Sequence, residues 1–199
     1  LAAAIAGAQR ETTTSLATRA AQKALDLADV LPSAIDLIIV ATATPEHIFP
    51  STASLVQDYL GATNAGAFDL SAACSGFVYG VDMAVSKIQT GTVNTALVIG
   101  AETLSRVVDW TDRGTCILFG DGAGAVVLQG SDTPGGVLGS VLRSDGSGWD
   151  MLTLPTANSR ETYLQDGAHQ QGRIYMDGRG VFRFATRVIG ESIRDALAQ

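Results

Sequence analysis

The stretch DLIIVATAT, residues 36–44, constrains the fold of this chain more than any other segment. It is a nearly continuous apolar run, which is typical of a strand covered on both faces of a sheet. Helical patterns flank it at 12–29 and 51–62. The first opens with hydroxyl-bearing residues that suit an N-cap, and Gly61 can end the second. The segment therefore predicts a buried strand between two helices.

The same alternation continues along the chain. Further strand-like runs lie at 65–72, 95–102, 122–130 and 135–146, and helical patterns lie at 75–90 and from about 180 to the end. A polar, irregular stretch at about 147–172 interrupts the pattern. Strands that alternate with helices at this spacing predict an α/β layered architecture with a largely parallel sheet.

The bulk composition excludes several classes of function. The 199 residues are 46% hydrophobic and 17% charged, which predicts a compact globular protein. A net charge of −7 argues against a nucleic-acid partner, and no apolar run is long enough to span a membrane. Two cysteines do not make a disulfide framework and favour a cytoplasmic location. His47 and His169 lack ligand-like spacing, so no metal site is expected.

The segment LSAACSGFVYG, residues 70–80, places a cysteine where a strand pattern gives way to a helical one. After the cysteine, apolar residues recur at Phe77, Val81 and Val85, a helical spacing of four. Cys74 therefore precedes a helix, and the positive end of the helix dipole favours a thiolate, the nucleophilic form of the side chain. Free cysteines are also commonly buried as small hydrophobes, and the segment alone leaves that alternative open.

Four longer segments carry a resemblance to a known family. They are DLSAACSGFVYG (69–80), GAETLS (100–105), DWTDRGTCILFGDGAGAVVL (109–128) and IYMDGRGVFRFA (174–185). Together they resemble β-ketoacyl-acyl-carrier-protein synthase III, the condensing enzyme that starts bacterial fatty-acid synthesis, from about Glu11 to Gln199. The resemblance implies a thiolase-like layered αβαβα fold of two similar halves. This chain is expected to cover the N-terminal half and the start of the second.

The resemblance also implies a two-step reaction. Cys74 matches the nucleophile that accepts an acyl group from a short acyl-CoA as a thioester, and its own backbone N–H is expected to form half of an oxyanion hole. Decarboxylative Claisen condensation with malonyl-acyl-carrier protein then gives a 3-oxoacyl-acyl-carrier protein. Arg113, in TDRGT, matches an arginine that contacts the nucleotide end of CoA, which suits a guanidinium. Acyl-CoA is a substrate in this scheme, so no cofactor is expected.

Further positions are implied for the acyl and pantetheine parts of the substrate. Phe49, in HIFPST, matches an aromatic that crosses a homodimer interface to cap the partner's acyl pocket. Phe119, in LFGDGAG, matches an aromatic close to the nucleophile. Gly178 and Phe182 lie where the family lines the pantetheine tunnel. Without the surrounding motifs, each phenylalanine would more often be simple core packing.

The C-terminal helical pattern carries three arginines on one face. Arg179, Arg183 and Arg187 are spaced by four. The family docks its acidic acyl carrier protein near this helix, and a basic face in a chain of net charge −7 is expected to steer such a partner. An ordinary solvated face is the alternative.

The family's other catalytic groups match no residue of this chain. They are a histidine and an asparagine that act on the malonyl thioester, and the resemblance places both after Gln199. We therefore expect residues 1–172 to form the N-terminal thiolase-like half, with the irregular insertion at about 147–172. Residues 173–199 are then expected to be the truncated first helix of the C-terminal half, as in a fragment of a longer protein.

Other functions remain as alternatives. A starter synthase of secondary metabolism or a hydroxymethylglutaryl-CoA synthase shares the superfamily, although DWTDRGTCILFGDGAG favours the fatty-acid enzyme. A non-catalytic subunit that binds a carrier protein would explain the missing histidine and asparagine, but would not need Cys74. A cysteine hydrolase with a nucleophile elbow would require glycine where Ala72 stands.

Overall fold

The computed structural model of the chain describes residues 11–133, 135–156 and 172–199. The described residues fall into two compact units. The first unit contains residues 11–103 and 121–133, and the second contains 104–120, 135–156 and 172–199. The predicted boundary between residues 172 and 173 concerns the halves of a larger fold, and it stays a prediction.

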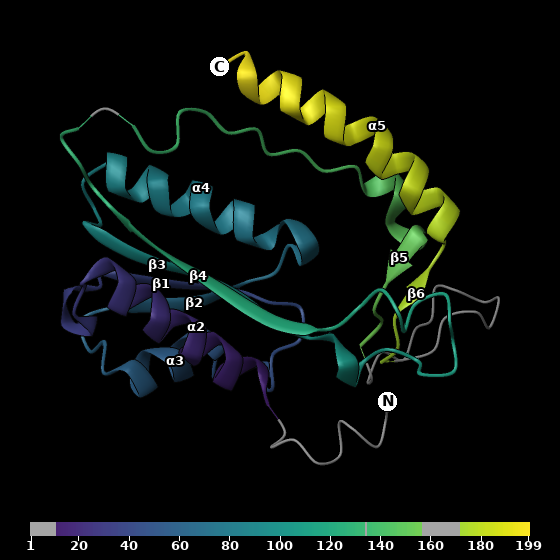
Figure 1. The fold of residues 1–199 in the computed structure, drawn as a ribbon, viewed down its shortest axis with the longest axis horizontal. Coiled ribbons are helices and arrows are strands. Elements are labelled where there is room, and N and C mark those ends of the chain that lie inside the picture. Colours follow the sequence, from purple (N-terminus) through teal and green to yellow (C-terminus); the bar gives the residue numbers. More distant parts are fainter. Residues whose placement is uncertain (1–10, 134, 157–171) are drawn as a thin grey trace. The chain divides into compact units, whose positions relative to one another are not determined.

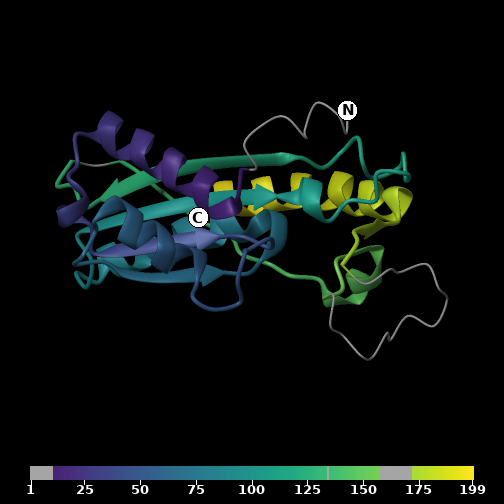
Figure 2. The ribbon, with the colours of Figure 1, turned by 90° about the horizontal axis from the view of Figure 1, so that it is seen from below.

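A four-stranded sheet lies within the first unit (Figures 1 and 2). Three of its strands run parallel, and the fourth is antiparallel to its neighbour, so the prediction of a largely parallel sheet is confirmed. All five residues of the first strand are buried, as its apolar sequence predicts. In the spatial order β2-β1-β3-β4, the strands are β2 (Gly66–Leu70), β1 (Leu37–Ala41), β3 (Thr95–Thr103) and β4 (Asp121–Gln129).

Helices cover both faces of this sheet (Figure 1). They are α2 (Thr13–Ala28), α3 (Thr52–Leu60) and α4 (Gly76–Gln89), with the 3-10 helix η1 (Pro32–Ala34) before β1. Ile38 and Val40 pack with α2 and α3 on one face, whereas Leu37 and Ile39 pack with α4 on the other. This α/β layering is the architecture that the sequence predicts.

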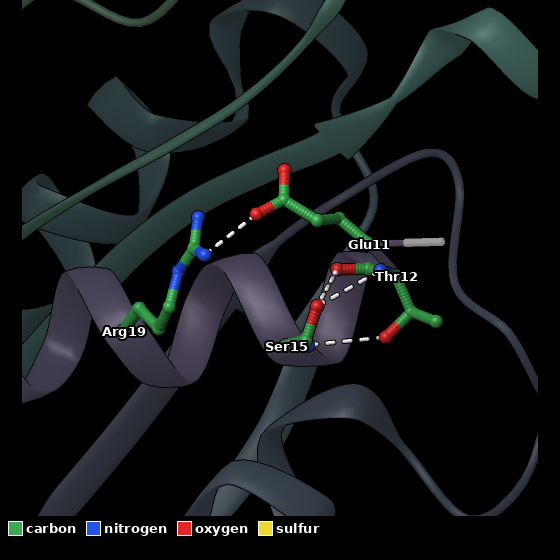
Figure 3. A network of polar contacts seen from close by, with 4 residues as sticks. All are labelled: Glu11, Thr12, Ser15 and Arg19. Carbon is green, nitrogen blue, oxygen red and sulfur yellow. Dashed lines mark hydrogen bonds and ion pairs between the residues drawn. The ribbon is translucent and has the colours of Figure 1, made fainter. Parts of the chain in front are cut away.

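The helix termini follow from local side chains. Figure 3 shows the first turn of α2, where Thr12 and Ser15 form a reciprocal capping box. Glu11 and Arg19 form an ion pair of 2.6 Å along the same helix, and both side chains are largely exposed. Gly61, with φ of 69°, ends α3 in the left-handed conformation that glycine adopts most readily.

The second unit is built from shorter elements and one long helix. Asp177 caps the long helix by accepting hydrogen bonds from the N–H groups of Arg179 and Gly180, each at 3.1 Å. The elements are η3 (Leu104–Arg106), η4 (Gly146–Met151), β5 (Leu152–Thr153), β6 (Tyr175–Met176) and α5 (Gly178–Leu197). β5 and β6 form a two-stranded antiparallel sheet.

Two sequence predictions fail in this region. The strand predicted at 135–146 is wrong, because residues 135–145 form no regular element. Gly135 and Gly136 have φ of 149° and 85°, and a run that begins in such conformations and is largely exposed does not enter a ladder. The stretch predicted as irregular at 147–172 contains η4 and β5, while its residues 157–171, including His169, lie outside the described ranges.

The described residues contain neither a membrane-spanning helix nor a cluster of metal ligands. Among residues 11–133, 135–156 and 172–199, no helix is long and apolar enough to cross a membrane. In the same ranges, no group of three or more His, Cys, Asp and Glu side chains is arranged to hold a metal ion.

Candidate active site

Cys74 lies in the turn between β2 and α4, within the short 3-10 helix η2 (Ala73–Ser75). α4 begins at Gly76, which confirms the predicted strand-to-helix junction. The Cys74 side chain is exposed, so it is not a small hydrophobe of the core. Ala73, directly before it, has φ of 44°, a left-handed conformation that costs a non-glycine residue about 1–3 kcal/mol. Strain of this kind is typical of functional turns.

Two buried glycines determine how closely α4 approaches the sheet. A Cβ atom on Gly76 would lie 3.0 Å from the Cβ of Ala41 in β1, and a Cβ on Gly80 would lie 3.0 Å from Cγ1 of Val98 in β3. Because a side chain at either position would crowd the strand below it, glycine allows α4 to lie directly on both strands. The turn with Cys74 therefore stays at the carboxyl end of β2, the end of a parallel sheet at which ligands commonly bind.

Phe49 lies in the connection between β1 and α3, where 85% of its surface is exposed. Buried hydroxyls hold the beginning of this connection. Thr13 Oγ1 donates to the carbonyl oxygen of Thr44 at 2.6 Å, and the Thr103 N–H donates to Thr44 Oγ1 at 2.8 Å. Thr44 Oγ1 in turn donates to the carboxylate of Glu102. The connection is thus fixed to α2 and β3 at one end, while Phe49 remains accessible.

Glu46, in the same connection, binds the first turn of α2. Its carboxylate accepts hydrogen bonds from Thr14, at 3.2 Å from the N–H and 2.6 Å from Oγ1. Partial burial alone would raise the pKa of Glu46, but the hydrogen bonds outweigh it and hold the pKa below its usual value. A groove of about 450 Å³ beside this contact is lined by α2, α3 and His47, and none of the predicted site residues lines it.

Arg113 lies in the second unit, on an exposed turn at 112–115. Asp112 closes this turn, because its carboxylate accepts hydrogen bonds from the Gly114 N–H at 2.9 Å and from Thr115 Oγ1 at 2.6 Å. Thr115 is buried, which anchors the turn. Among the described residues, the Arg113 guanidinium has no ion-pair partner. Phe119, farther along the same connection, is half-buried.

A second aspartate shapes the preceding turn. Asp109 accepts hydrogen bonds from the N–H and the hydroxyl of Thr111, at 2.8 and 2.7 Å. These bonds, together with the nearby positive charge of Arg173, hold the pKa of Asp109 below its ordinary value. Arg173 itself donates from Nη1 to the carbonyl oxygens of Val108 at 2.9 Å and Arg106 at 3.4 Å.

The remaining predicted residues lie on α5. Gly178 is its first residue, and Phe182 is exposed. The guanidinium of Arg187 lies 5.8 Å from the centre of the Phe184 ring. The predicted arginines are all exposed, and within the described residues neither Arg179 nor Arg183 has an ion-pair partner.

The predicted site residues divide between the units. The first unit contains Cys74 and Phe49, and the second contains Arg113, Phe119, Gly178, Arg179, Phe182, Arg183 and Arg187. Their roles stay predictions.

Sequence reasoning missed three residues of interest. Arg194 lies seven residues after Arg187 and so on the same face of α5; a search at the spacing of two helical turns, rather than of four residues, would have found it. The Asp-x-Gly pattern at 112–114 is a turn signal that could have identified Asp112. Arg173 has no local signal, because Val108 is 65 residues away in sequence.

The chain is similar in sequence to known β-ketoacyl-[acyl-carrier-protein] synthases of type III. The family model for 3-oxoacyl-[acyl-carrier-protein (ACP)] synthase III matches residues 68–146. A curated β-ketoacyl-[acyl-carrier-protein] synthase III from Paramagnetospirillum magneticum is 49% identical over 196 residues, which cover 96% of this chain and 58% of the relative. This chain therefore spans somewhat under two thirds of that relative's length.

Solved structures of such proteins have the same fold. The crystal structure of 3-oxoacyl-[acyl-carrier-protein] synthase III from Aquifex aeolicus VF5 matches with a TM-score of 0.86 and 46% identity, over 96% of this chain and 57% of that one. The priming β-ketosynthase of the R1128 polyketide biosynthetic pathway matches with a TM-score of 0.82 and 38% identity, over 93% and 55%. These matches confirm the predicted thiolase-like fold class.

Proposed function

Since the chain belongs to the 3-oxoacyl-[acyl-carrier-protein] synthase III family, we propose that it acts as the condensing enzyme that initiates fatty-acid synthesis. The observation that carries this proposal is Cys74, exposed after a strained residue and directly before α4. A thiol that is reachable and close to the positive end of a helix is well suited to accept an acyl group.

In the first step, the Cys74 thiolate attacks the carbonyl carbon of an acyl-CoA thioester. The negative charge moves to the carbonyl oxygen, where backbone N–H donors stabilise it. When the tetrahedral intermediate collapses, the bond from carbon to the CoA sulfur breaks. CoA leaves as a thiolate that takes up a proton, and the acyl group stays on Sγ of Cys74.

In the second step, malonyl-acyl-carrier protein loses carbon dioxide and the resulting carbanion attacks the acyl-cysteine carbonyl. The carbon–sulfur bond to Cys74 breaks, which releases a 3-oxoacyl-acyl-carrier protein and regenerates the thiolate. The family's histidine and asparagine serve this step in the scheme. No residue of this chain matches either, so the acyl-transfer step is the one that its own residues support.

Substrate binding is assigned to residues of both units. By the family resemblance, we assign Arg113 to the nucleotide end of CoA, Phe119 to the family's aromatic close to the nucleophile, and Phe49 to the cap of the acyl pocket across a homodimer. The exposure of Phe49 and Arg113 supports these assignments, because each needs a side chain that a second molecule can reach. Gly178 and Phe182 line the path of the pantetheine arm.

The acyl carrier protein is assigned to the basic face of α5. Arg179 and Arg183 support this assignment, because both are exposed and neither is neutralised by a described neighbour. The approach of an acidic carrier to such a face is favoured by long-range electrostatic attraction. Arg187 is also exposed, and its guanidinium lies 5.8 Å from the centre of the Phe184 ring.

Acyl labelling tests the first step. The full-length protein is incubated with acetyl-CoA labelled in the acetyl group, digested, and mapped by mass spectrometry. We expect the label on the peptide that contains Cys74, its loss in Cys74→Ala, and its retention in the matched variant Cys116→Ala. An unlabelled Cys74 peptide would refute the proposal and leave a non-catalytic carrier-binding subunit as the better explanation.

A polyketide-priming role is the second candidate, because the R1128 priming β-ketosynthase is 38% identical over 93% of this chain. The two functions differ in the acyl group that is accepted. Competition between acetyl-CoA and longer or branched acyl-CoA for labelling of Cys74 separates them. A preference for acetyl-CoA supports the fatty-acid function, and a strong preference for another primer supports the priming function.

A further inference from the structure

We propose that Arg173 is a positioning residue for Arg113. It holds the segment that leads into the turn bearing Arg113, and so it sets the affinity for the nucleotide end of acyl-CoA without touching that substrate. This inference rests on the proposed function, in which Arg113 is the residue that contacts CoA.

The contacts of Arg173 fix the beginning of the connection between β3 and β4. Its Nη1 donates to the Val108 carbonyl oxygen at 2.9 Å and reaches that of Arg106 at 3.4 Å. The next residue, Ile174, donates its backbone N–H to the Val107 carbonyl oxygen at 2.9 Å. Three successive carbonyl groups at the end of η3 are therefore bound from one short segment, and Val108 and Ile174 are buried.

The connection continues from this anchor to Arg113 through two linked turns. The Asp112 N–H donates to the Asp109 carbonyl oxygen at 3.1 Å, and the side chain of Asp109 binds Thr111. Asp112 then closes the turn around Arg113. Arg173 also stabilises the Asp109 carboxylate electrostatically. Every bond in the series is local except those of residues 173 and 174, so these two residues tie the turns to the rest of the second unit.

The contacts of the Arg173 guanidinium can be removed without removing the backbone hydrogen bond of Ile174. The variant Arg173→Ala loses the bonds to Val108 and Arg106 and the charge near Asp109, but it keeps the Ile174 N–H bond. In this variant the turn with Arg113 samples more orientations before it binds the nucleotide. The conformational entropy that is lost when the turn becomes ordered then weakens the binding of acyl-CoA. The sulfur chemistry at Cys74 is not involved, so kcat is expected to stay unchanged.

The experiment compares two acyl donors on the full-length enzyme. Acetyl-CoA carries the nucleotide, whereas acetyl-pantetheine delivers the same thioester without it. For Arg173→Ala we expect the KM for acetyl-CoA to rise about ten-fold, which corresponds to the loss of one or two hydrogen bonds to a charged group. The KM for acetyl-pantetheine and kcat for both donors should stay within two-fold. The control Arg19→Ala, which removes an exposed arginine from the first unit, should change neither KM.

A double-mutant cycle with Arg113→Ala completes the test. If Arg173 acts through Arg113, adding Arg173→Ala to Arg113→Ala raises the KM for acetyl-CoA no further. Additive effects, or equal effects on both donors, would overturn the inference and indicate a general structural role. If Arg113→Ala raises only the KM for acetyl-CoA while Arg173→Ala changes neither KM, the inference about Arg173 is overturned and the proposed role of Arg113 still stands. An Arg113→Ala that does not distinguish the donors would refute the proposed role of Arg113, and the inference would fail with it.

Discussion

The carboxylate and backbone of Asp36 join three strands of the first unit at their starts. Asp36, directly before β1, accepts hydrogen bonds at Oδ2 from the N–H groups of Asn94 at 2.8 Å and Thr95 at 3.0 Å. Its own backbone N–H donates to the Thr95 carbonyl oxygen, and its carbonyl oxygen accepts from Gly66. One residue thus aligns the starts of β1, β2 and β3.

The pKa of Asp36 gives a test of this contact. Hydrogen bonds from the Thr95 and Asn94 N–H groups lower the pKa of Asp36 below its ordinary value, because they stabilise the charged carboxylate. The stability that follows is therefore fully present above about pH 4, the ordinary pKa of the group, and is lost as the pH falls through the lowered pKa. We expect Asp36→Asn to be less stable than the parent at pH 7, with the difference shrinking towards pH 2.5.

Urea unfolding of both proteins at the two pH values measures the effect. Asp58→Asn, which changes an exposed carboxylate in α3, is the control and should differ little from the parent at either pH. A stability difference for Asp36→Asn that does not depend on pH would contradict the assignment.

For single residues, features with a local signal in the sequence could be predicted, whereas contacts between residues far apart in the sequence could not. Cys74 could be predicted because strand and helix patterns meet at that residue. The hydrogen bonds among Thr13, Thr44 and Thr103 could not be predicted, since they join residues 31 to 90 positions apart in hydroxyl-rich segments with many equivalent candidates.

Among the elements, α4 packs against the sheet through two buried glycines. Gly80 is buried, and the nearest atom to an added Cβ would be Cγ1 of Val98 at 3.0 Å, in the middle of β3. Neither element can move away without disturbing the core around Ile39 and Val98.

Gly80→Ala is therefore expected to destabilise the protein. Alanine favours a helix over glycine by about 1 kcal/mol, but crowding in a close-packed core costs about 1–3 kcal/mol. We expect a net loss of about 1 kcal/mol in the free energy of unfolding, measured in urea. The control Gly190→Ala, in exposed α5, meets only the end of the Arg194 side chain at 3.7 Å and should be neutral or stabilising. Equal effects of the two changes would contradict the role of this contact.

Helix α5 carries the charge pattern on which the carrier-protein proposal depends. Arg183→Glu is expected to raise the KM for malonyl-acyl-carrier protein about three- to ten-fold in the full-length enzyme, because it reverses a charge on the approaching face. The KM for acyl-CoA should not change, and the effect should decrease at high salt. Arg19→Glu makes the same change in charge on α2. An equal loss in that control would point to net charge rather than to the face.

Several elements could be predicted because their signals are complete within a few residues. Ser51 and Gly61 bracket α3, and all five residues of β1 are apolar. The direction of β4 had no such signal, since an antiparallel strand and a parallel one have similar apolar runs. The strand predicted at 135–146 failed because its two pairs of apolar residues follow Gly135 and Gly136, whose positive φ angles do not suit a strand.

At the scale of the described molecule, helix α5 carries a stripe of exposed apolar side chains. Only Gly180 of this helix is buried, whereas Phe182, Ile189 and Ile193 are each more than half exposed. On a helix these three positions fall within a narrow stripe. Exposed stripes of this kind promote association with other apolar surfaces.

The 199-residue chain is therefore expected to self-associate in solution. Replacing Ile189 and Ile193 by glutamate should shift it towards the monomer, as measured by size-exclusion chromatography with light scattering. The matched variant Thr186→Glu with Gly190→Glu adds the same charge at the same spacing on the arginine-bearing side. If both variants shift the distribution equally, charge repulsion rather than the apolar stripe is responsible.

The antiparallel pairing of β3 with β4 has a consequence for how this protein could diversify. Thr103 faces Asp121 across the ladder, so the connection that carries Arg113 and Phe119 leaves and re-enters the sheet at one fixed point. Because the pairing of β3 with β4 holds both ends of the connection next to each other, the length and composition of the connection can vary without changing the register of the strands. The connection can therefore be exchanged for that of a relative. If Arg113 and Phe119 act as proposed, such an exchange changes how acyl donors are recognised and leaves Cys74 in place.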